Sequence, residues 1–160
     1  MYVCRIHTSL ESKVLPTSTR FVVAVHTLAI LAIHERRPVR SEDLAFSANT
    51  NPTVIRSLLS ALANAGFTTA QLGAGGGALL AKKASHITLV DVYRAVEDSE
   101  FFSMHRSSPS SVCVVGKNIQ NVLRPTLDKA QAALEAELGS VTIADVAAEI
   151  ARRGDFAISS

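Results

Sequence analysis

A cluster of glycines is the first feature of the sequence that could bind a ligand. The stretch 72–81, LGAGGGALLA, holds four of the eight glycines of this 160-residue chain. Glycine-rich loops bind phosphate groups when a strand precedes them and a helix follows. Here short apolar runs typical of strands lie on both sides. The cluster therefore favours a β-hairpin turn that needs positive backbone φ angles over a phosphate site.

Cys113 is the residue best suited to covalent chemistry. It lies three residues before Gly116, where we expect a long helix to begin. Amide groups at a helix start stabilise a thiolate, and Lys117 or Arg106 could add to the effect. A thiolate here would react with oxidants or electrophiles, which predicts a redox sensor. The alternative is a small buried side chain that only packs.

Metal binding and thiol catalysis find little support in the sequence. His105 and Cys113 would supply half of a metal site at most, and Cys4 is too far from Cys113 for a zinc motif. A catalytic thiol would need a histidine partner, and none stands in a recognisable context. We therefore expect no catalytic residue, no metal and no cofactor, and we interpret the chain as a binding protein rather than an enzyme.

A third set of residues has the chemistry to bind double-stranded DNA. Arginines precede a short helix, polar side chains lie at the start of the next helix, and two lysines follow the glycines. Helix starts and basic side chains bind phosphates, and the second helix of a helix-turn-helix contacts base edges with its first turns. The candidate DNA-binding residues are Arg36, Arg37, Arg40, Ser41, Thr50, Asn51, Thr53, Arg56, Gln71, Gly75, Gly76, Lys82 and Lys83.

Several of these candidates have an ordinary structural alternative. Arg36 and Arg37 could simply be charged residues at a solvated helix end, and Arg56 could be a surface charge without a binding role. Asn51 is first of all a helix cap. The two lysines could merely keep an edge strand from pairing with another chain.

Three helices are predicted to carry the polar candidates. The first covers the apolar run 21–33, whose 13 residues are fewer than the ~20 that span a membrane. We expect Ser41 to cap the second helix, and Asn51 to cap the third with Pro52 in its first position. The side chains of the third helix that are expected to face a core are Val54, Leu58, Leu59 and Leu62.

A hairpin after three helices makes a winged helix-turn-helix, so the predicted fold is mainly α with a small β-hairpin wing. Strands are expected within 67–73 and 77–84. A helix capped by Thr88, a loop over 99–112, a long helix over 116–138 and a last helix capped by Thr142 follow.

The long helix carries one apolar stripe, with spacings of 4, 4, 3, 4 and 4 residues. A stripe of this length outside a compact domain needs a partner helix, and pairing about a two-fold axis is the commonest solution. We therefore expect a homodimer. The predicted interface residues are Ile119, Leu123, Leu127, Ala130, Leu134 and Leu138.

Composition agrees with a small intracellular protein. Hydrophobic residues make up 48% of the chain, the net charge is +2, and two cysteines are too few for a disulfide scaffold. We expect a cytoplasmic protein with no membrane partner. The predicted organisation is a tail over 1–17, a DNA-binding domain over 18–84, and the remaining helices over 85–160.

The order of several segments resembles the Rrf-two family of bacterial winged-helix transcription regulators, which includes IscR- and NsrR-like proteins. The matching segments are STRFVVAVHTLAILA, NPTVIRSLLSALANAGF, GAGGGALLAKKASHITLVDVYRAVE, CVVGKNIQNVLRPTLDKAQAALEAEL and TIADV, within about residues 17–150. The resemblance implies a dimer that binds palindromic operator DNA and acts as a repressor.

The iron–sulfur members of the family carry three cysteines before the long helix, where this chain has Cys113 alone. The chain therefore resembles the cluster-free, YwnA-like branch, for which C-x-V-G-x-N-I-Q, found at 113–120, is typical. The alternative that stays open is a winged-helix scaffold or small-ligand sensor with weak or lost DNA binding. The wing favours that alternative. Many members have an aromatic residue and then a basic residue after the glycines, and this chain has Ala78 and Leu79 at those positions.

Overall fold

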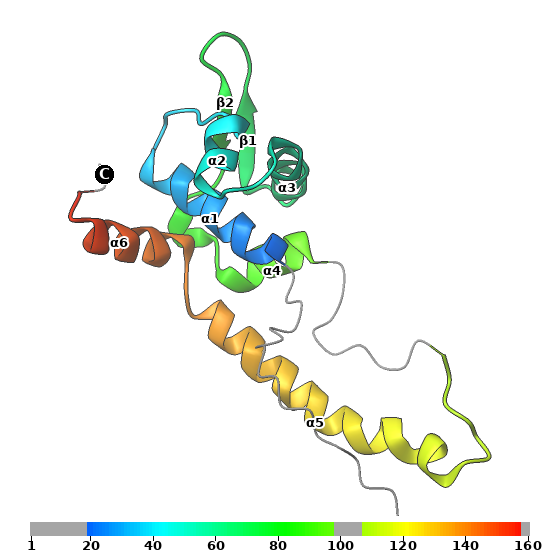
Figure 1. Ribbon diagram of the computed structural model, residues 1–160. Coiled ribbons are helices and arrows are strands. Elements are labelled where there is room, and N and C mark those ends of the chain that lie inside the picture. The colour runs from blue at the N-terminus through cyan, green and yellow to red at the C-terminus, as the bar shows by residue number, and fades with distance from the viewer. Residues whose placement is uncertain (1–18, 98–106, 158–160) are drawn as a thin grey trace, which may run out of the picture.

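The computed structural model describes residues 19–97 and 107–157 (Figure 1). Its elements are α1 (Thr19–Ile33), α2 (Ser41–Ser47), α3 (Pro52–Asn64), β1 (Thr68–Gln71), β2 (Gly77–Leu80), η1 (Ala84–His86), α4 (Leu89–Val96), α5 (Val114–Gly139) and α6 (Ile143–Gly154). The predicted tail 1–17, with Cys4, lies outside the described residues, as do His105 and Arg106 in the predicted loop.

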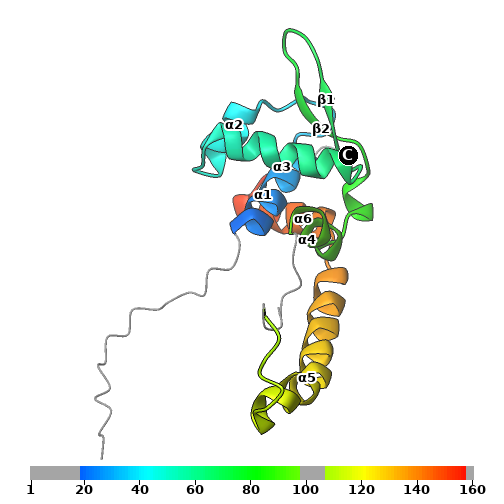
Figure 2. The ribbon, with the colours of Figure 1, turned by 90° about the vertical axis from the view of Figure 1, so that its right-hand side faces the viewer.

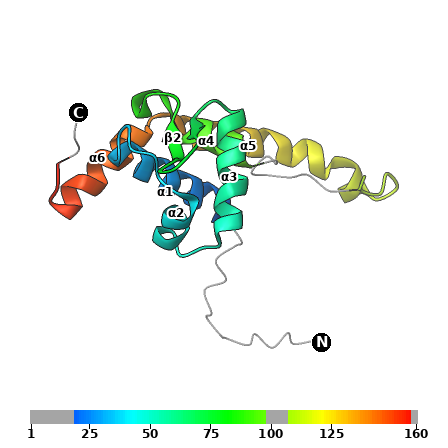
Figure 3. The same ribbon diagram turned by 90° about the horizontal axis from the view of Figure 1, so that it is seen from above.

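The molecule consists of a compact head and one projecting helix. The head contains α1 to α4, the hairpin and α6, and the hairpin rises from one end of it (Figures 1 and 2). Helix α5 extends from the side of the head opposite the hairpin. Seen from above, α5 and α6 leave the head in opposite directions (Figure 3). This arrangement confirms the predicted winged helix-turn-helix with an appended long helix.

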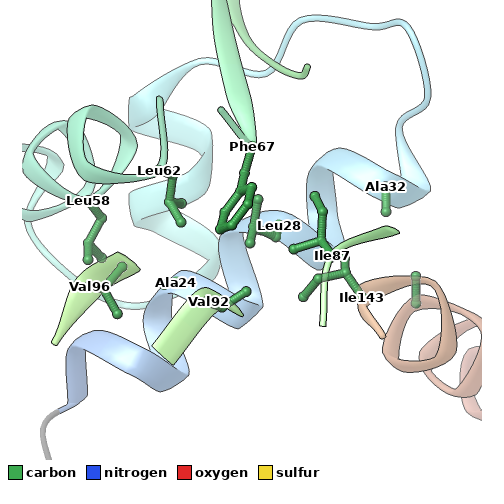
Figure 4. Packing of buried hydrophobic residues seen from close by; sticks show 11 residues of the cluster. Ala24, Leu28, Ala32, Leu58, Leu62, Phe67, Ile87, Val92, Val96 and Ile143 are labelled. Carbon is green, nitrogen blue, oxygen red and sulfur yellow. The ribbon is translucent and has the colours of Figure 1, made fainter. Parts of the chain in front are cut away.

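The main core joins helices from both parts of the chain. Leu28 of α1, Leu62 of α3, Val92 of α4 and Ile143 of α6 are fully buried in one cluster (Figure 4). Burying a leucine or isoleucine side chain contributes about 1.5–3 kcal/mol. The cluster thus attaches α4 and α6 firmly to α1 and α3. The predicted division into domains at residue 84 stays a prediction.

A second cluster sets the position of the helix-turn-helix on α1. Leu31, Leu44, Ile55 and Ala78 are buried together, and they come from α1, α2, α3 and β2 in turn. Because side chains in such a cluster interdigitate, they fix the angle between α2 and α3 and dock the hairpin beside them.

The face of α3 that meets the core differs from the prediction. Val54 was expected in the core, but its side chain is 42% exposed, and Ile55 is buried instead. Ile55, Leu58 and Leu62 follow the helical spacing of three and four residues, whereas Val54 lies about 100° around the helix from Ile55. Leu58 and Leu62 were predicted correctly.

The predicted caps are confirmed for three helices and wrong for α2. Asn51, Thr88 and Thr142 accept the expected backbone hydrogen bonds at the starts of α3, α4 and α6. Ser41, however, is the first residue of α2, Arg40 occupies the cap position, and no side chain caps this helix. Ser41 Oγ instead donates to Glu42 Oε1 over 3.2 Å.

The glycine cluster is the turn of a β-hairpin, as predicted. The strands pair antiparallel from Thr68 opposite Leu80 to Gln71 opposite Gly77, which is shorter than the predicted ranges. Gly73 and Gly75 have φ angles of +98° and +81°, which glycine adopts without steric cost. An extended strand follows the glycines, so the strand-loop-helix arrangement of a phosphate site is absent from this segment.

A backbone pair that the sequence did not predict anchors the hairpin. The Val39 amide donates to the Ala78 carbonyl over 3.0 Å, and the Ala78 amide donates to the Val39 carbonyl over 2.8 Å. The segment before α2 is therefore bonded to the wing. No helix among the described residues combines the length and apolar composition that crossing a bilayer requires.

Candidate nucleic-acid interface

The start of α3 presents polar side chains to solvent. Asn51 Oδ1 accepts the Thr53 amide over 2.8 Å, and Pro52 occupies the first turn without wasting a donor. Asn51 and Thr53 are exposed, while Thr50 is half-buried and donates its backbone amide to Ala45 over 2.9 Å. The first turn of α3 is thus rigid and carries hydrogen-bonding groups that no core residue covers.

Arg56 lies one turn further along α3 and is paired with a residue of α2. Its Nη2 is 2.6 Å from Glu42 Oε1, and both side chains are more than half exposed. Glu42 was not among the candidate residues predicted from the sequence. The two residues are 14 positions apart, on two helices whose relative angle depends on the packing of the head.

The arginines of the turn between α1 and α2 form an exposed basic segment. Arg36 has a φ angle of +61°, a left-handed conformation that reverses the chain after α1. Arg37 donates its backbone amide to His34, and Arg40 precedes α2. All three arginine side chains are exposed, and none has a side-chain partner among the described residues.

The candidates on the hairpin are divided between its tip and its base. Gln71 and Gly75 are exposed and Gly76 is half-buried at the tip. At the base, Lys82 lies 5.7 Å from the centre of the Phe67 ring, a distance at which the cation and the ring attract, and Lys83 is exposed.

A groove between α3 and the hairpin brings three candidates together. It has a volume of about 380 Å³, and it is lined by Ser41, Arg56 and Gln71 together with apolar residues such as Leu59. The candidate arginines of the turn and the two lysines do not line this groove. The proposed contacts therefore fall into a central group beside α3 and flanking basic segments.

The structure adds an exposed aromatic residue that sequence reasoning missed. Phe46 of α2 is 89% exposed, and it lies with Asn49, Thr50 and Asn51 around a second hollow at the turn of the helix-turn-helix. From the sequence alone, an apolar residue such as Phe46 on a short helix is expected to be buried in the core. Its exposure follows from the packing of α2 through Leu44 and Ala45.

Helix α5 has no buried residue within the chain. It begins two residues before the predicted start and ends one residue after the predicted end. Leu123 and Ala130 of the predicted stripe are exposed, and the other four stripe residues are half-buried. Val115 and Val122 add exposed apolar surface, 66% and 67% respectively. An ion pair between Arg94 and Glu135 joins α4 to α5.

Cys113 occupies the cap position of α5 and is exposed. The backbone amides of Gly116 and Val115 lower the pKa of the thiol. The predicted contribution of Lys117 is not among the causes, and Arg106 lies outside the described residues. The helix start alone therefore favours the thiolate.

Comparison with known proteins agrees with this architecture. The family model Rrf2, described as an iron-dependent transcriptional regulator, matches residues 17–149. A Bacillus subtilis (strain 168) protein named "Putative HTH-type transcriptional regulator YwnA" is 41% identical over 81% of this chain and 95% of its own length. A crystal structure described as "a putative DNA binding protein" is 40% identical, with a TM-score of 0.63, over 79% of this chain and 97% of its own. The IscR of T. potens is 25% identical, with a TM-score of 0.67, over 91% and 94% of the two chains.

The two cysteines of this chain do not fit an iron–sulfur cluster, although the family model is described as iron-dependent. The sequence has two cysteines, and among the described residues no three His, Cys, Asp or Glu side chains lie close enough to hold a metal ion. An iron–sulfur cluster is normally held by several thiolates. Cys113 by itself cannot supply that set.

Fold, element order and sequence identity all lead to one classification. The hairpin follows three helices, a long helix projects from the head, and the family model covers most of the chain. The relatives are transcriptional regulators rather than enzymes. The chain belongs to the Rrf2 family of transcriptional regulators.

Proposed function

We propose that this protein is a homodimeric, DNA-binding repressor that acts in the cytoplasm without an iron–sulfur cluster. The observation that carries the proposal is the apolar face of α5. Twenty-six residues of helix, roughly 39 Å long at 1.5 Å per residue, leave the head with none of their side chains buried. A second copy of α5 is the partner that would cover this face symmetrically.

The proposed interface residues lie along that face. Leu123 and Ala130 are open to solvent, and Ile119, Leu127, Leu134 and Leu138 are half-buried beside them. Paired α5 helices would hold two heads at a fixed separation. A separation of about 34 Å between the two α3 helices would let them enter successive major grooves on one side of the DNA.

Each head would bind DNA through the candidates named above. The exposed start of α3 is the proposed reading element, with Asn51, Thr53 and Arg56 nearest the base edges and Thr50 behind them. The arginines of the turn before α2 and the lysines at the base of the hairpin would bind phosphates. Gln71 and the hairpin glycines would approach the neighbouring groove.

Fluorescence anisotropy with the DNA upstream of the protein's own gene tests this function. We expect saturable binding that is much tighter than binding to a scrambled duplex of equal length, and that weakens as salt is raised because counterions are released. Sedimentation at micromolar concentration should show a dimer. A monomer, or equal affinity for both duplexes at low salt, would contradict the proposal.

We further propose that Cys113 gates DNA binding by oxidation or modification. The support is an exposed thiol with a lowered pKa at the start of the helix that would form the dimer. A charged or bulky adduct there would change how the two α5 helices meet. Peroxide should weaken operator binding of the wild type and not of Cys113→Ser, and dithiothreitol should restore it. Equal sensitivity of both proteins would refute the gate.

A winged-helix scaffold with weak DNA binding is the second candidate. It is favoured by a hairpin tip that carries no charged residue between Leu72 and Ala81, and by Leu72 being 90% exposed there. Such a protein would still form the dimer. Dimeric sedimentation combined with no preference for the upstream duplex would select this candidate over the first.

A further inference from the structure

The ion pair between Glu42 and Arg56 crosses the helix-turn-helix at its solvent face. Arg56 Nη2 lies 2.6 Å from Glu42 Oε1, and the same oxygen accepts the Ser41 hydroxyl over 3.2 Å. The backbone amide of Glu42 itself, then Arg56 and Ser41, lower the pKa of the Glu42 carboxyl. The carboxylate is therefore charged at neutral pH and held by several donors.

Stability does not account for this pair. The two side chains are 59% and 57% exposed, and exposed ion pairs contribute little to folding because water and salt screen them. Asp43, the next residue of α2, has the same charge and is also in the first turn, yet it forms no ion pair with the described residues. Glu42 and Asp43 can therefore both interact favourably with the helix dipole, but of these two residues only Glu42 forms an ion pair with Arg56.

The pair leaves most of the guanidinium available. An arginine has five N–H donors, and Glu42 engages only Nη2 of Arg56 among the described residues. The side chain lies along the groove between α3 and the hairpin, where Ser41 and Gln71 also lie. A guanidinium held at one nitrogen keeps two parallel donors for a planar acceptor pair, such as O6 and N7 of guanine.

An arginine without such a support would bind any nearby phosphate. A carboxylate beside it repels phosphate and restricts the rotamers that the long side chain adopts. We propose that Glu42 is a positioning residue that directs Arg56 to a guanine base edge rather than to the DNA backbone. This inference rests on the proposed function, since it assumes that α3 enters the major groove of an operator.

Base preference distinguishes this role from a structural one. The full-length protein would be selected against a pool of duplexes with a randomised core, at one fixed salt concentration. The variants are Glu42→Gln, Arg56→Lys and the matched control Asp43→Asn, which removes an equal charge one residue further along α2. Affinity for a scrambled duplex and thermal unfolding would be measured for each.

We expect the wild type to prefer guanine at one symmetric pair of operator positions. Arg56→Lys and Glu42→Gln should each reduce that preference roughly tenfold at the same positions, because lysine lacks the planar fork and the unsupported arginine is no longer held toward the base. Glu42→Gln should bind the scrambled duplex at least as tightly as Asp43→Asn does, and Asp43→Asn should keep the wild-type preference.

Three results would overturn the assignment of Glu42. The first is that Glu42→Gln keeps the wild-type guanine preference at the positions where Arg56→Lys loses it. The second is that Asp43→Asn loses the preference as much as Glu42→Gln does. The third is a full guanine preference in Arg56→Lys, because Arg56 would then read no base. A wild type without any site-specific binding would instead refute the proposed function, and the inference would fail with it.

Discussion

Thr88 and Thr142 face each other as an antiparallel backbone pair, and each of them caps a helix. On either side of the pair, the Leu89 amide donates to Val141 and the Ile143 amide donates to Ile87, both over 2.9 Å. The starts of α4 and α6 are therefore bonded to each other. Helix α5 ends only a few residues before α6 begins, so this junction between the starts of α4 and α6 fixes where α5 leaves the head.

Replacing Thr88 by alanine tests the junction. Thr88 Oγ1 accepts the Asp91 amide over 3.2 Å, and the Asp91 carboxylate accepts the Thr88 amide over 3.1 Å. Loss of such a cap costs about 1 kcal/mol, so we expect the free energy of unfolding of Thr88→Ala to fall by that amount. Urea denaturation at one protomer concentration measures it. Thr126→Ala, an exposed substitution inside α5, is the control and should not lower stability, because alanine has the higher helix propensity. Equal stability of Thr88→Ala and wild type would contradict the prediction.

Gly77→Ala should disturb the wing. A Cβ atom on Gly77 would lie 2.5 Å from the Val39 carbonyl oxygen, and backbone on both sides prevents an easy shift. We expect a loss of about 1–3 kcal/mol, typical of overpacking, and a lower Tm. Gly139→Ala is the matched control, because its Cβ would only touch Val90 Cγ1 at an ordinary 3.6 Å. Unchanged thermal unfolding of Gly77→Ala would mean that the pairing of Val39 with the hairpin is dispensable.

Aspartate substitutions at two alanines of α5 distinguish an effect on dimerisation from an effect on the helix itself. Ala130 lies on the predicted stripe and Ala132 lies about 200° further around the helix, and both are exposed. Ala130→Asp would place a charge in the proposed interface, whose burial is costly. We expect it to weaken the dimer at least tenfold in sedimentation experiments, whereas Ala132→Asp should remain dimeric. Equal dimerisation of the two variants would place the interface elsewhere.

The pH dependence of alkylation tests the thiol of Cys113. The amides of Gly116 and Val115 lower its pKa, so the native thiol should lose its proton at a lower pH than the same thiol in unfolded protein. Because only the thiolate reacts, the iodoacetamide rate in a Cys4→Ser background should reach its half-maximum at lower pH in the native state than in denaturant. A native midpoint equal to or above the denatured one would show that the helix start does not act on the sulfur.

Several features of the candidate site were predictable because their causes are local. Asn51 followed by Pro52 specifies a helix start within three residues, and the cap geometry is as expected. The hairpin follows from glycines that tolerate positive φ angles between two short apolar runs. The exposure of Arg56 follows from its position between the apolar residues of α3.

The features that sequence reasoning missed depend on long-range packing. Ser41 begins α2 instead of capping it, and the segment just before the helix is bonded to β2 through Val39. Val54 faces solvent and Ile55 faces the core, because the side of α3 that packs against the rest of the head carries Ile55, Leu58 and Leu62. The carboxylate of Glu42 reaches Arg56 only because the second buried cluster, with Leu44 of α2 and Ile55 of α3, sets the angle between the two helices.

The sequence by itself determined the elements of this protein, their order, the caps of α3, α4 and α6, and the wing, because each depends on dihedral preferences and hydrogen bonds within a few residues. Only the tertiary structure decided which face of α3 is open, which carboxylate accompanies Arg56 and how α5 leaves the head. Those relationships join residues far apart in the chain, and the close packing of buried side chains, which admits few arrangements, selects among them.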